Sequence, residues 1–363
     1  MPELGVAGEP GVGGRHLAFW LACHNPAMRL DDRFDDLVIS LGGFYRTWFV
    51  FAGLELGLLA ALYDARPDGL TINELARRTS VQPDLVARWA WGADAHDLVE
   101  LDGDRITVFE EVATILLDAD RAEYLGGQYL HAAIGSLDFD ALPDVMRTGR
   151  ALASRPDRYR VAIERLTVQD VSVFFKELLA ALPQLIVDLR PGCRILDVHC
   201  GGGRWLTAMA RRFPDTLLTG IEFEPDSVAR ARANVLAAGL EERITIEPGD
   251  VTDVGHAGEM DLVYFQYALH QLRDAPAALR SAHAALAANG WLVALDWYLP
   301  SDPEELRTRQ AELIAGVQLD EMLQGTRLVT RGEALGWFAD AGLPTPELID
   351  LPSGASAIVV RGG

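Results

Sequence analysis

Two stretches of the sequence combine carboxylates, histidines and glycines at spacings suited to chemistry. The first, residues 195–205 (ILDVHCGGGRW), brings Asp197 and His199 up to a run of three glycines. The second, residues 267–274 (YALHQLRD), carries His270. Because an unperturbed histidine titrates near neutral pH, His270 is suited to removing a proton from a substrate. The alternative is a histidine that only caps or packs after a strand.

The glycine run has the composition of a nucleotide-binding turn. An apolar strand candidate carries Asp197 near its end, and Gly201 to Gly203 lead into a helical stretch at 205–213. Glycines let the backbone approach a ligand closely, and the start of a helix offers free N–H donors. Such turns bind ligands at the carboxyl edge of an open α/β sheet. Glu222 ends the next strand candidate, where a carboxylate can hold two ribose hydroxyls.

These residues suit either a dinucleotide or S-adenosylmethionine, and two features separate the two ligands. The dinucleotide fingerprint ends in a glycine, but this chain has Leu206 there. Asp197 precedes the turn, where a carboxylate suits the ammonium group of a methionine moiety. The sequence here resembles the class I S-adenosylmethionine-dependent methyltransferases, whose first motif reads roughly hhDhGxGxG against ILDVHCGGG. The resemblance runs from about residue 40 to 361 and implies S-adenosyl-L-methionine as the cofactor.

The same resemblance implies further cofactor contacts. His199 replaces the first motif glycine, so its side chain either points aside from an extended backbone or touches the methionine carboxylate or the reacting centre. This departure is also compatible with weaker binding or an unusual use of the cofactor. The ribose would be held by Glu222 beside Phe223, and the adenine would lie between Asp250 and Val251. The implied cofactor-binding set is Asp197, His199, Gly201, Gly203, Glu222, Phe223, Asp250, Val251 and Gln266.

The second stretch resembles the LHDW-x-D segment of small-molecule O-methyltransferases that have an N-terminal winged-helix dimerisation domain. That resemblance implies that His270 is the general base and that Asp296 orients it. Asp296 could instead cap a helix or lie in solvent. Some members carry a further glutamate, which is missing from the corresponding stretch 327–330, and either Asp320 or Glu321 could replace it.

The expected reaction is transfer of a methyl group to a small apolar or aromatic acceptor, at a hydroxyl oxygen. The alternatives are a C- or N-methyltransferase, a non-methylating enzyme on the same scaffold, or a ligand-sensing regulator. Candidates for the wall of the acceptor pocket are Tyr129, His131, Met146, Phe174, Tyr267, Trp297 and Tyr298.

The elements that must position these residues fall into four segments. Residues 1–30 read as a flexible leader, and 31–115 as a winged-helix-like dimerisation domain with an apolar helix over 35–63. In that domain Thr71 and Glu74 predict a capped helix, a second helix covers 83–95, and a hairpin turns at Asp102 and Gly103. Residues 116–182 form a helical connector that lines the substrate pocket, and 183–363 form the cofactor-binding domain.

The last segment alternates strands with helices, which predicts an α/β, Rossmann-like, mostly parallel seven-stranded sheet. Its last two strands are joined by a short link, which predicts an antiparallel end to the sheet. The strand candidates are 194–198, 217–222, 243–247, 261–266, 291–297, 347–351 and 357–360.

Bulk properties limit the partners. The formal net charge of -21 repels phosphate backbones and anionic membranes, so we expect no nucleic-acid and no membrane partner. The three cysteines have no paired spacing, which favours a reducing, cytoplasmic compartment. No ligand-like spacing predicts a metal site. The apolar stretch 36–63 and the resemblance together predict a homodimer.

Overall fold

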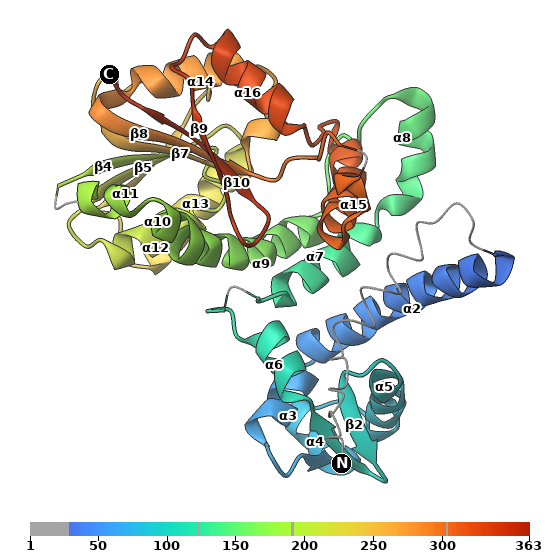
Figure 1. Cartoon of the computed structure of the whole chain (residues 1–363). Coiled ribbons are helices and arrows are strands. Elements are labelled where there is room, and N and C mark those ends of the chain that lie inside the picture. The colour runs from blue at the N-terminus through green and yellow to red at the C-terminus, as the bar shows by residue number, and fades with distance from the viewer. Residues whose placement is uncertain (1–28, 122, 190–191, 303) are drawn as a thin grey trace, which may run out of the picture.

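The computed structural model describes residues 29–121, 123–189, 192–302 and 304–363. A small N-terminal unit and a larger C-terminal α/β unit are joined by a run of helices, shown in green in the middle of Figure 1. Of the expected leader, only its last two residues are described. The expected boundary at 115 falls inside α6 (Glu110–Leu117), before α7 (Gly126–Ser136). The expected boundary at 182 falls just before α11 (Pro183–Asp188).

The N-terminal apolar stretch forms two helices rather than one. Helix α2 covers Leu30–Glu55, and α3 covers Leu58–Asp64. The break falls at Gly57, whose φ of 67° is left-handed and suits glycine. Among the described residues, α2 is long and apolar enough to cross a membrane by length and composition. Only 11% of its most apolar window is buried, so its apolar side chains mostly face outward.

The helices and the hairpin expected in the N-terminal segment are present. Helix α4 (Ile72–Thr79) starts with the expected capping box, in which Thr71 Oγ1 accepts from the Glu74 amide. Helix α5 (Pro83–Ala95) follows, and then the hairpin of β2 (Val99–Asp102) and β3 (Arg105–Val108). Strand β1 (Leu70–Thr71) pairs with β3 to complete a three-stranded antiparallel sheet.

The connector is helical, with breaks at Gly149 and before Asp157. Gly149, at a φ of 65°, caps α8, and the next long helix starts after Pro156. That helix, α9, continues through a π-helical turn, η2, toward the C-terminal domain. The remaining elements here are η1 (Phe139–Ala141), α8 (Leu142–Thr148), α9 (Asp157–Val173), η2 (Phe174–Leu178) and α10 (Leu179–Ala181).

The C-terminal domain contains the predicted seven-stranded sheet, in the order β6-β5-β4-β7-β8-β10-β9. The first five strands in this order are parallel, and β10 runs antiparallel to both β8 and β9, as predicted. The largest boundary difference is in β8, which begins five residues before the predicted 291. The strands are β4 (Arg194–Val198), β5 (Leu217–Glu222), β6 (Ile244–Pro248), β7 (Met260–Gln266), β8 (Leu286–Asp296), β9 (Glu347–Asp350) and β10 (Ser356–Arg361).

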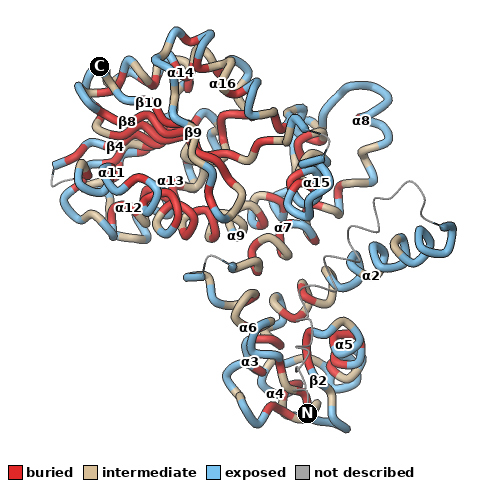
Figure 2. The backbone as a smooth tube through the Cα atoms, in the orientation of Figure 1, coloured by how far each residue is buried: buried red, intermediate tan, exposed pale blue. Residues whose placement is uncertain are grey.

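Both faces of this sheet are covered, so its strands are buried (Figure 2). One hydrophobic cluster joins the sheet to α9–α13 and includes Phe174, Trp205 and Tyr264. The other joins it to α14 and α16 and includes Phe265 and Phe338. The helices not yet bounded are α12 (Arg204–Arg212), α13 (Pro225–Ala237), η3 (Leu269–Gln271), α14 (Ala275–Ala284), η4 (Glu305–Arg307), α15 (Arg309–Gln324) and α16 (Arg331–Asp340).

Candidate active site

A cavity of about 1290 Å³ lies at the carboxyl ends of β4, β5 and β7, roofed by α9 and closed on one side by α15. Chain order reverses here, because β5 follows β4 on one side and β7 lies on its other side. Open α/β sheets bind ligands at such a reversal. The predicted residues that line the cavity are Asp197, His199, Gly201, Glu222, Phe223, Gln266 and His270.

His270 is held firmly by Asp296. Its Nδ1 lies 2.8 Å and 2.9 Å from the two oxygens of this carboxylate, which is fully buried at the end of β8. The Trp297 amide also donates to Asp296, at 2.8 Å, and holds the carboxylate in turn. Asp296 does not line the cavity, so it reaches the site only through the imidazole. The bond assigns Nδ1 as the donor and leaves Nε2 as the nitrogen available for chemistry.

A second carboxylate approaches the other ring nitrogen. Glu321 Oε1 lies 3.6 Å from His270 Nε2, and both side chains are at most 5% exposed. Burial opposes charge on His270, but Asp296 and Glu321 outweigh it and raise the pKa of the imidazole to about 10. Burial also opposes charge on Glu321, but His270 lowers the pKa of that carboxyl below its usual value. Of the two acids the sequence left open, the structure brings Glu321 to His270.

Asp320 faces a different partner. Its carboxylate lies 3.1 Å from the guanidinium of Arg155, which also bonds Asp138 at 2.9 Å. All three side chains are at most 10% exposed. This buried network ties α15 to the segment that precedes α9, and so fixes the helix that carries Glu321. The sequence analysis missed Arg155, because its partners are 17 and 165 residues away in the chain.

The glycine turn is held against the end of β5. The amides of His199 and Cys200 both donate to the Ile221 carbonyl, at 2.8 Å and 3.0 Å. His199 has a left-handed φ of 65°, which excludes the alternative in which its backbone is extended. Its Nδ1 lies 2.9 Å from Glu222 Oε2, and its ring stacks on Phe223 with centroids 5.2 Å apart. His199 therefore lies over the predicted ribose-binding acid.

Two predicted side chains place buried polar groups in the cavity. The Nε2 atom of Gln266 is buried and has no hydrogen-bond partner among the described residues. Asp197 is only 3% exposed, and burial, reinforced by Glu222 and opposed by His199, raises its pKa to about 8. Both sit on neighbouring strands, at the ends of β7 and β4.

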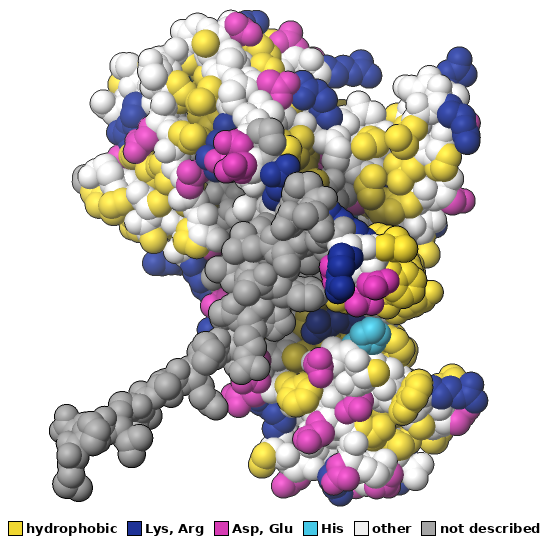
Figure 3. All heavy atoms as spheres, turned by 45° about the vertical axis from the view of Figure 1, so that its right-hand side comes forward, with side chains coloured by type: hydrophobic (Ala, Val, Ile, Leu, Met, Phe, Trp, Pro, Cys, Tyr) yellow, Lys and Arg dark blue, Asp and Glu magenta, His cyan; other side chains and the backbone are white. Residues whose placement is uncertain are grey.

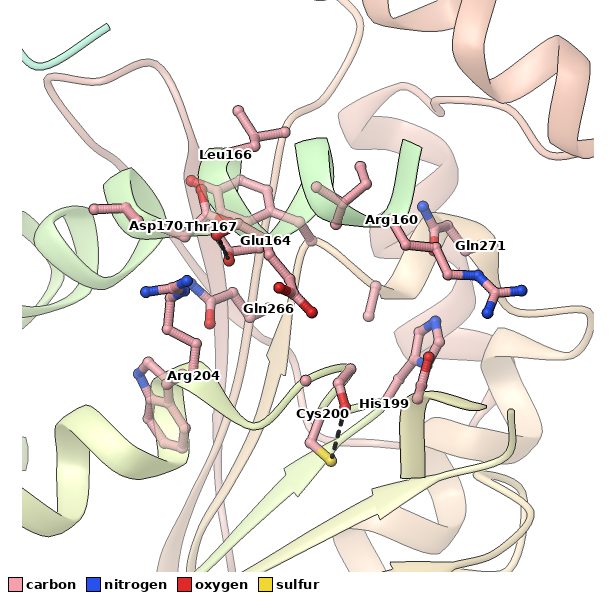
Figure 4. A pocket seen from close by; sticks show the side chains of 18 of the residues that line it. Arg160, Glu164, Leu166, Thr167, Asp170, His199, Cys200, Arg204, Gln266 and Gln271 are labelled. Carbon is pink, nitrogen blue, oxygen red and sulfur yellow. Dashed lines mark hydrogen bonds between the residues drawn. The ribbon is translucent and has the colours of Figure 1, made fainter. Parts of the chain in front are cut away.

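Asp170 on α9 also lines the cavity, and the sequence analysis missed this acid. Figure 4 shows it on the same side of the cavity as Arg204 and Gln266. Burial raises its pKa to about 8, although Arg204 opposes the shift. The signal in the sequence is a single acid in the otherwise uncharged stretch 167–175. The sequence alone does not show which face of α9 meets the cavity.

Three of the predicted cofactor residues do not line the cavity. Gly203 caps α12 with a left-handed φ of 71°. Asp250 instead accepts hydrogen bonds from the amide and hydroxyl of Thr252, at 2.9 Å and 2.8 Å. Val251 packs in the hydrophobic cluster beside α14. The predicted role of Gly203 in cofactor binding, and the predicted contacts of Asp250 and Val251 with the adenine, therefore remain predictions.

The predicted acceptor wall is present in part. His131, Tyr267 and Trp297 line the cavity, and the last two rings lie 4.7 Å apart. Phe174 and Tyr298 are instead core residues, and Met146 is 71% exposed. Tyr129 packs against the N-terminal core. The wall therefore mixes aromatic surface with the buried polar groups described above.

Comparison with known proteins identifies the domain that carries this site. Residues 195–290 match the family described as methyltransferase domain. A 27-O-demethylrifamycin SV methyltransferase from Amycolatopsis mediterranei is 29% identical over 166 residues, 44% of this chain and 59% of that protein. A ubiquinone biosynthesis O-methyltransferase from Bordetella avium is 32% identical over 28% of this chain and 41% of that protein. The chain thus spans less than two thirds of the length of these relatives.

Solved structures resemble nearly the whole chain. PigF with SAH has a TM-score of 0.69 at 18% identity, covering 93% of this chain and 100% of that one. Human N-acetylserotonin methyltransferase in complex with SAM has a TM-score of 0.63 at 18% identity, covering 93% and 99%. The mitomycin 7-O-methyltransferase MmcR has a TM-score of 0.64 at 18% identity, covering 97% and 100%. Residues 195–290 thus carry a methyltransferase domain, and the chain shares the fold of these S-adenosylmethionine-dependent methyltransferases.

Proposed function

We propose that this protein transfers the methyl group of S-adenosylmethionine to a hydroxyl oxygen of a small, partly aromatic acceptor, with His270 as the general base. The observation that carries the proposal is the buried pair of His270 and Asp296, which presents one imidazole nitrogen at the wall of a cavity. Transfer to oxygen requires removal of a proton, and a positioned imidazole performs that task.

The polar groups of the cavity suit the cofactor. Gln266 offers an unsatisfied buried amide nitrogen, and Asp197 a buried carboxyl group, where a zwitterionic methionine end needs partners. Arg204, at the start of α12, adds a positive charge suited to its carboxylate. A Cβ built at Gly201 would meet no atom within 4 Å, so the turn leaves open space for a ligand. Glu222 is the proposed ribose acid, and Asp250 and Val251 are the proposed neighbours of the adenine.

S-adenosylmethionine, when bound, supplies a methyl group already activated on a sulfonium. The chain's own residues then have two tasks: to align the acceptor and to take its proton. Asp296 holds the ring so that Nε2 receives the proton of the acceptor hydroxyl. Because two carboxylates raise the pKa of His270 to about 10, the ring is a strong base once neutral, and the neutral fraction grows with pH.

The test measures S-adenosylhomocysteine formation with a panel of phenols, hydroquinones and aliphatic alcohols. The expected result is turnover with a hydroxylated acceptor and a loss of roughly 10²–10⁴-fold in His270→Ala, the usual contribution of a general base. His283→Ala is the matched control, because His283 is outside the cavity. Turnover that His270→Ala leaves unchanged would favour transfer to carbon or nitrogen instead.

We also propose that α2 mediates a homodimer, as the resemblance implies. Its first half exposes a run of large apolar side chains to a degree unusual for a monomer. Figure 3 shows hydrophobic side chains gathered at the level of α2 on the right-hand side. The exposed set on this helix is Leu30, Phe34, Leu37, Val38, Ile39, Leu41, Phe44 and Tyr45.

A further inference from the structure

The carboxylate of Glu222, which the proposed function assigns to the ribose, is already saturated within the protein. Oε2 accepts from His199 Nδ1 at 2.9 Å and from the Gly201 amide at 3.0 Å. Oε1 accepts from the amides of Phe223 and Glu224, at 2.9 Å and 3.0 Å. A carboxylate has about four lone-pair sites, so these four donors fill it. Its side chain is only 1% exposed.

Of these four donors, three are backbone amides and one is the imidazole of His199. The amides belong to the glycine turn and to the start of the segment before α13, so moving them would rebuild the loop. The imidazole is attached by rotatable bonds, and its side chain is 20% exposed at the cavity wall. His199 is therefore the donor that can leave Glu222 by rotation of a side chain alone.

The surroundings of His199 favour its hold on Glu222. Asp197 faces it from β4, Glu222 from β5, and Gln271 from η3, and Arg160 of α9 lies on the opposite side of the cavity near Gln271 in Figure 4. Burial opposes charge on the ring, but the bond and charge of Glu222, with Gln271 and Asp197, outweigh it and raise the pKa of His199. The bond to Glu222 is therefore charge-assisted, the stronger class of hydrogen bond.

We propose that His199 competes with the ribose of the cofactor for Glu222, so that the cofactor binds only when the imidazole has left this carboxylate. The inference rests on the proposed function, since it takes Glu222 as the ribose acid. Its consequence is that the residue in place of the motif glycine sets the affinity for S-adenosylmethionine and S-adenosylhomocysteine. This chain then binds both more weakly than its own glycine variant.

The experiment is calorimetric titration of the full chain with S-adenosylhomocysteine. His199→Gly is expected to bind it roughly ten- to a hundredfold more tightly than wild type, since a charge-assisted competitor has been removed. His199→Asn, which also tolerates a left-handed backbone, is a second variant that keeps the test available if glycine loosens the turn. His199→Asn removes the charge of the imidazole ring and is expected to bind S-adenosylhomocysteine more tightly than wild type, but by a smaller factor than His199→Gly.

His256→Gly is the matched control. His256 also has a left-handed φ, of 57°, and its Nε2 lies 3.2 Å from Glu247, but it is outside the cavity. The affinity of His256→Gly for S-adenosylhomocysteine should equal that of wild type. Equal affinities for wild type and His199→Gly, weaker binding by the variant, or an equal gain in His256→Gly would each overturn the inference alone. Absence of heat in every protein would overturn the proposed function as well.

Discussion

The position of His270 between two carboxylates makes a specific prediction for Glu321→Gln. The substitution keeps the size of the side chain and an oxygen that can still accept from Thr326, but removes one negative charge 3.6 Å from His270 Nε2. Asp296 still holds Nδ1, so the ring keeps its orientation. Because a neighbouring anion favours the imidazolium, its removal must lower the pKa of His270.

The distance sets the size of this shift. Coulomb's law with an effective dielectric constant of about 20 gives roughly 4–5 kcal/mol for unit charges at this separation. At about 1.4 kcal/mol per pKa unit this corresponds to an upper limit of about three units. Rearrangement of polar groups and water reduces the effect, so we expect the pKa of His270 to fall by about one to three units.

The assay is an NMR titration of protein labelled in its histidine rings, which needs no acceptor. The His270 signal is identified by its loss in His270→Ala, and its midpoint is compared between wild type and Glu321→Gln. Glu312→Gln, an exposed change on the same helix, is the control and should leave the midpoint unmoved. A His270 midpoint that stays within a few tenths of a unit in Glu321→Gln would refute the reasoning. Once an acceptor is known, the alkaline rise of kcat/KM should move to lower pH by the same amount.

Three further predictions concern stability and assembly. Arg155→Leu leaves the buried carboxylate of Asp320 unpaired and leaves Asp138 with Arg158 alone, so it should lower the free energy of unfolding in guanidinium by about 3–5 kcal/mol. Exposed Arg78→Leu should cost little, and equal costs would contradict the assignment. Because the folded-state pKa of Asp170 is raised to about 8, the stability of the protein falls as pH rises from about 4 to 8. Asp170→Asn should therefore match wild type near pH 4 and exceed it near pH 8.5, by at most about 5–6 kcal/mol, whereas an equal gain at both pH values would exclude this cause. Leu37→Glu in α2 should convert a dimer to a monomer in sedimentation velocity, and an unchanged mass would reject α2 as the interface.

Much of the site could be predicted from the sequence because its motifs are local. The strand, the glycine turn and the helix after it lie within residues 194–212, and their order places Asp197 and the turn at one edge of a sheet. The capping box of Thr71 and the alternation of strands and helices likewise depend on near neighbours in the chain. The resemblance added His270 and Asp296, which the structure brings within 2.8 Å.

Other features depend on contacts that no local pattern encodes. Asp320 and Glu321 are adjacent, and successive residues of a helix point about 100° apart. Only the packing of α15 decides that Glu321 meets His270 while Asp320 meets Arg155. Similarly, the sequence shows that His199 replaces a glycine, but its bond to Glu222 follows from the pairing of β4 with β5.

The sequence by itself therefore determined the class of domain, the elements and most residues at the cavity, because short-range pattern and hydrophobic periodicity specify these. Tertiary structure decided which acids lie beside His270, that Asp170 is buried, and that four donors fill the carboxylate of Glu222. The physical reason is that burial and the distance between charges, which set pKa values and hydrogen bonds, exist only after segments far apart in the chain have packed together.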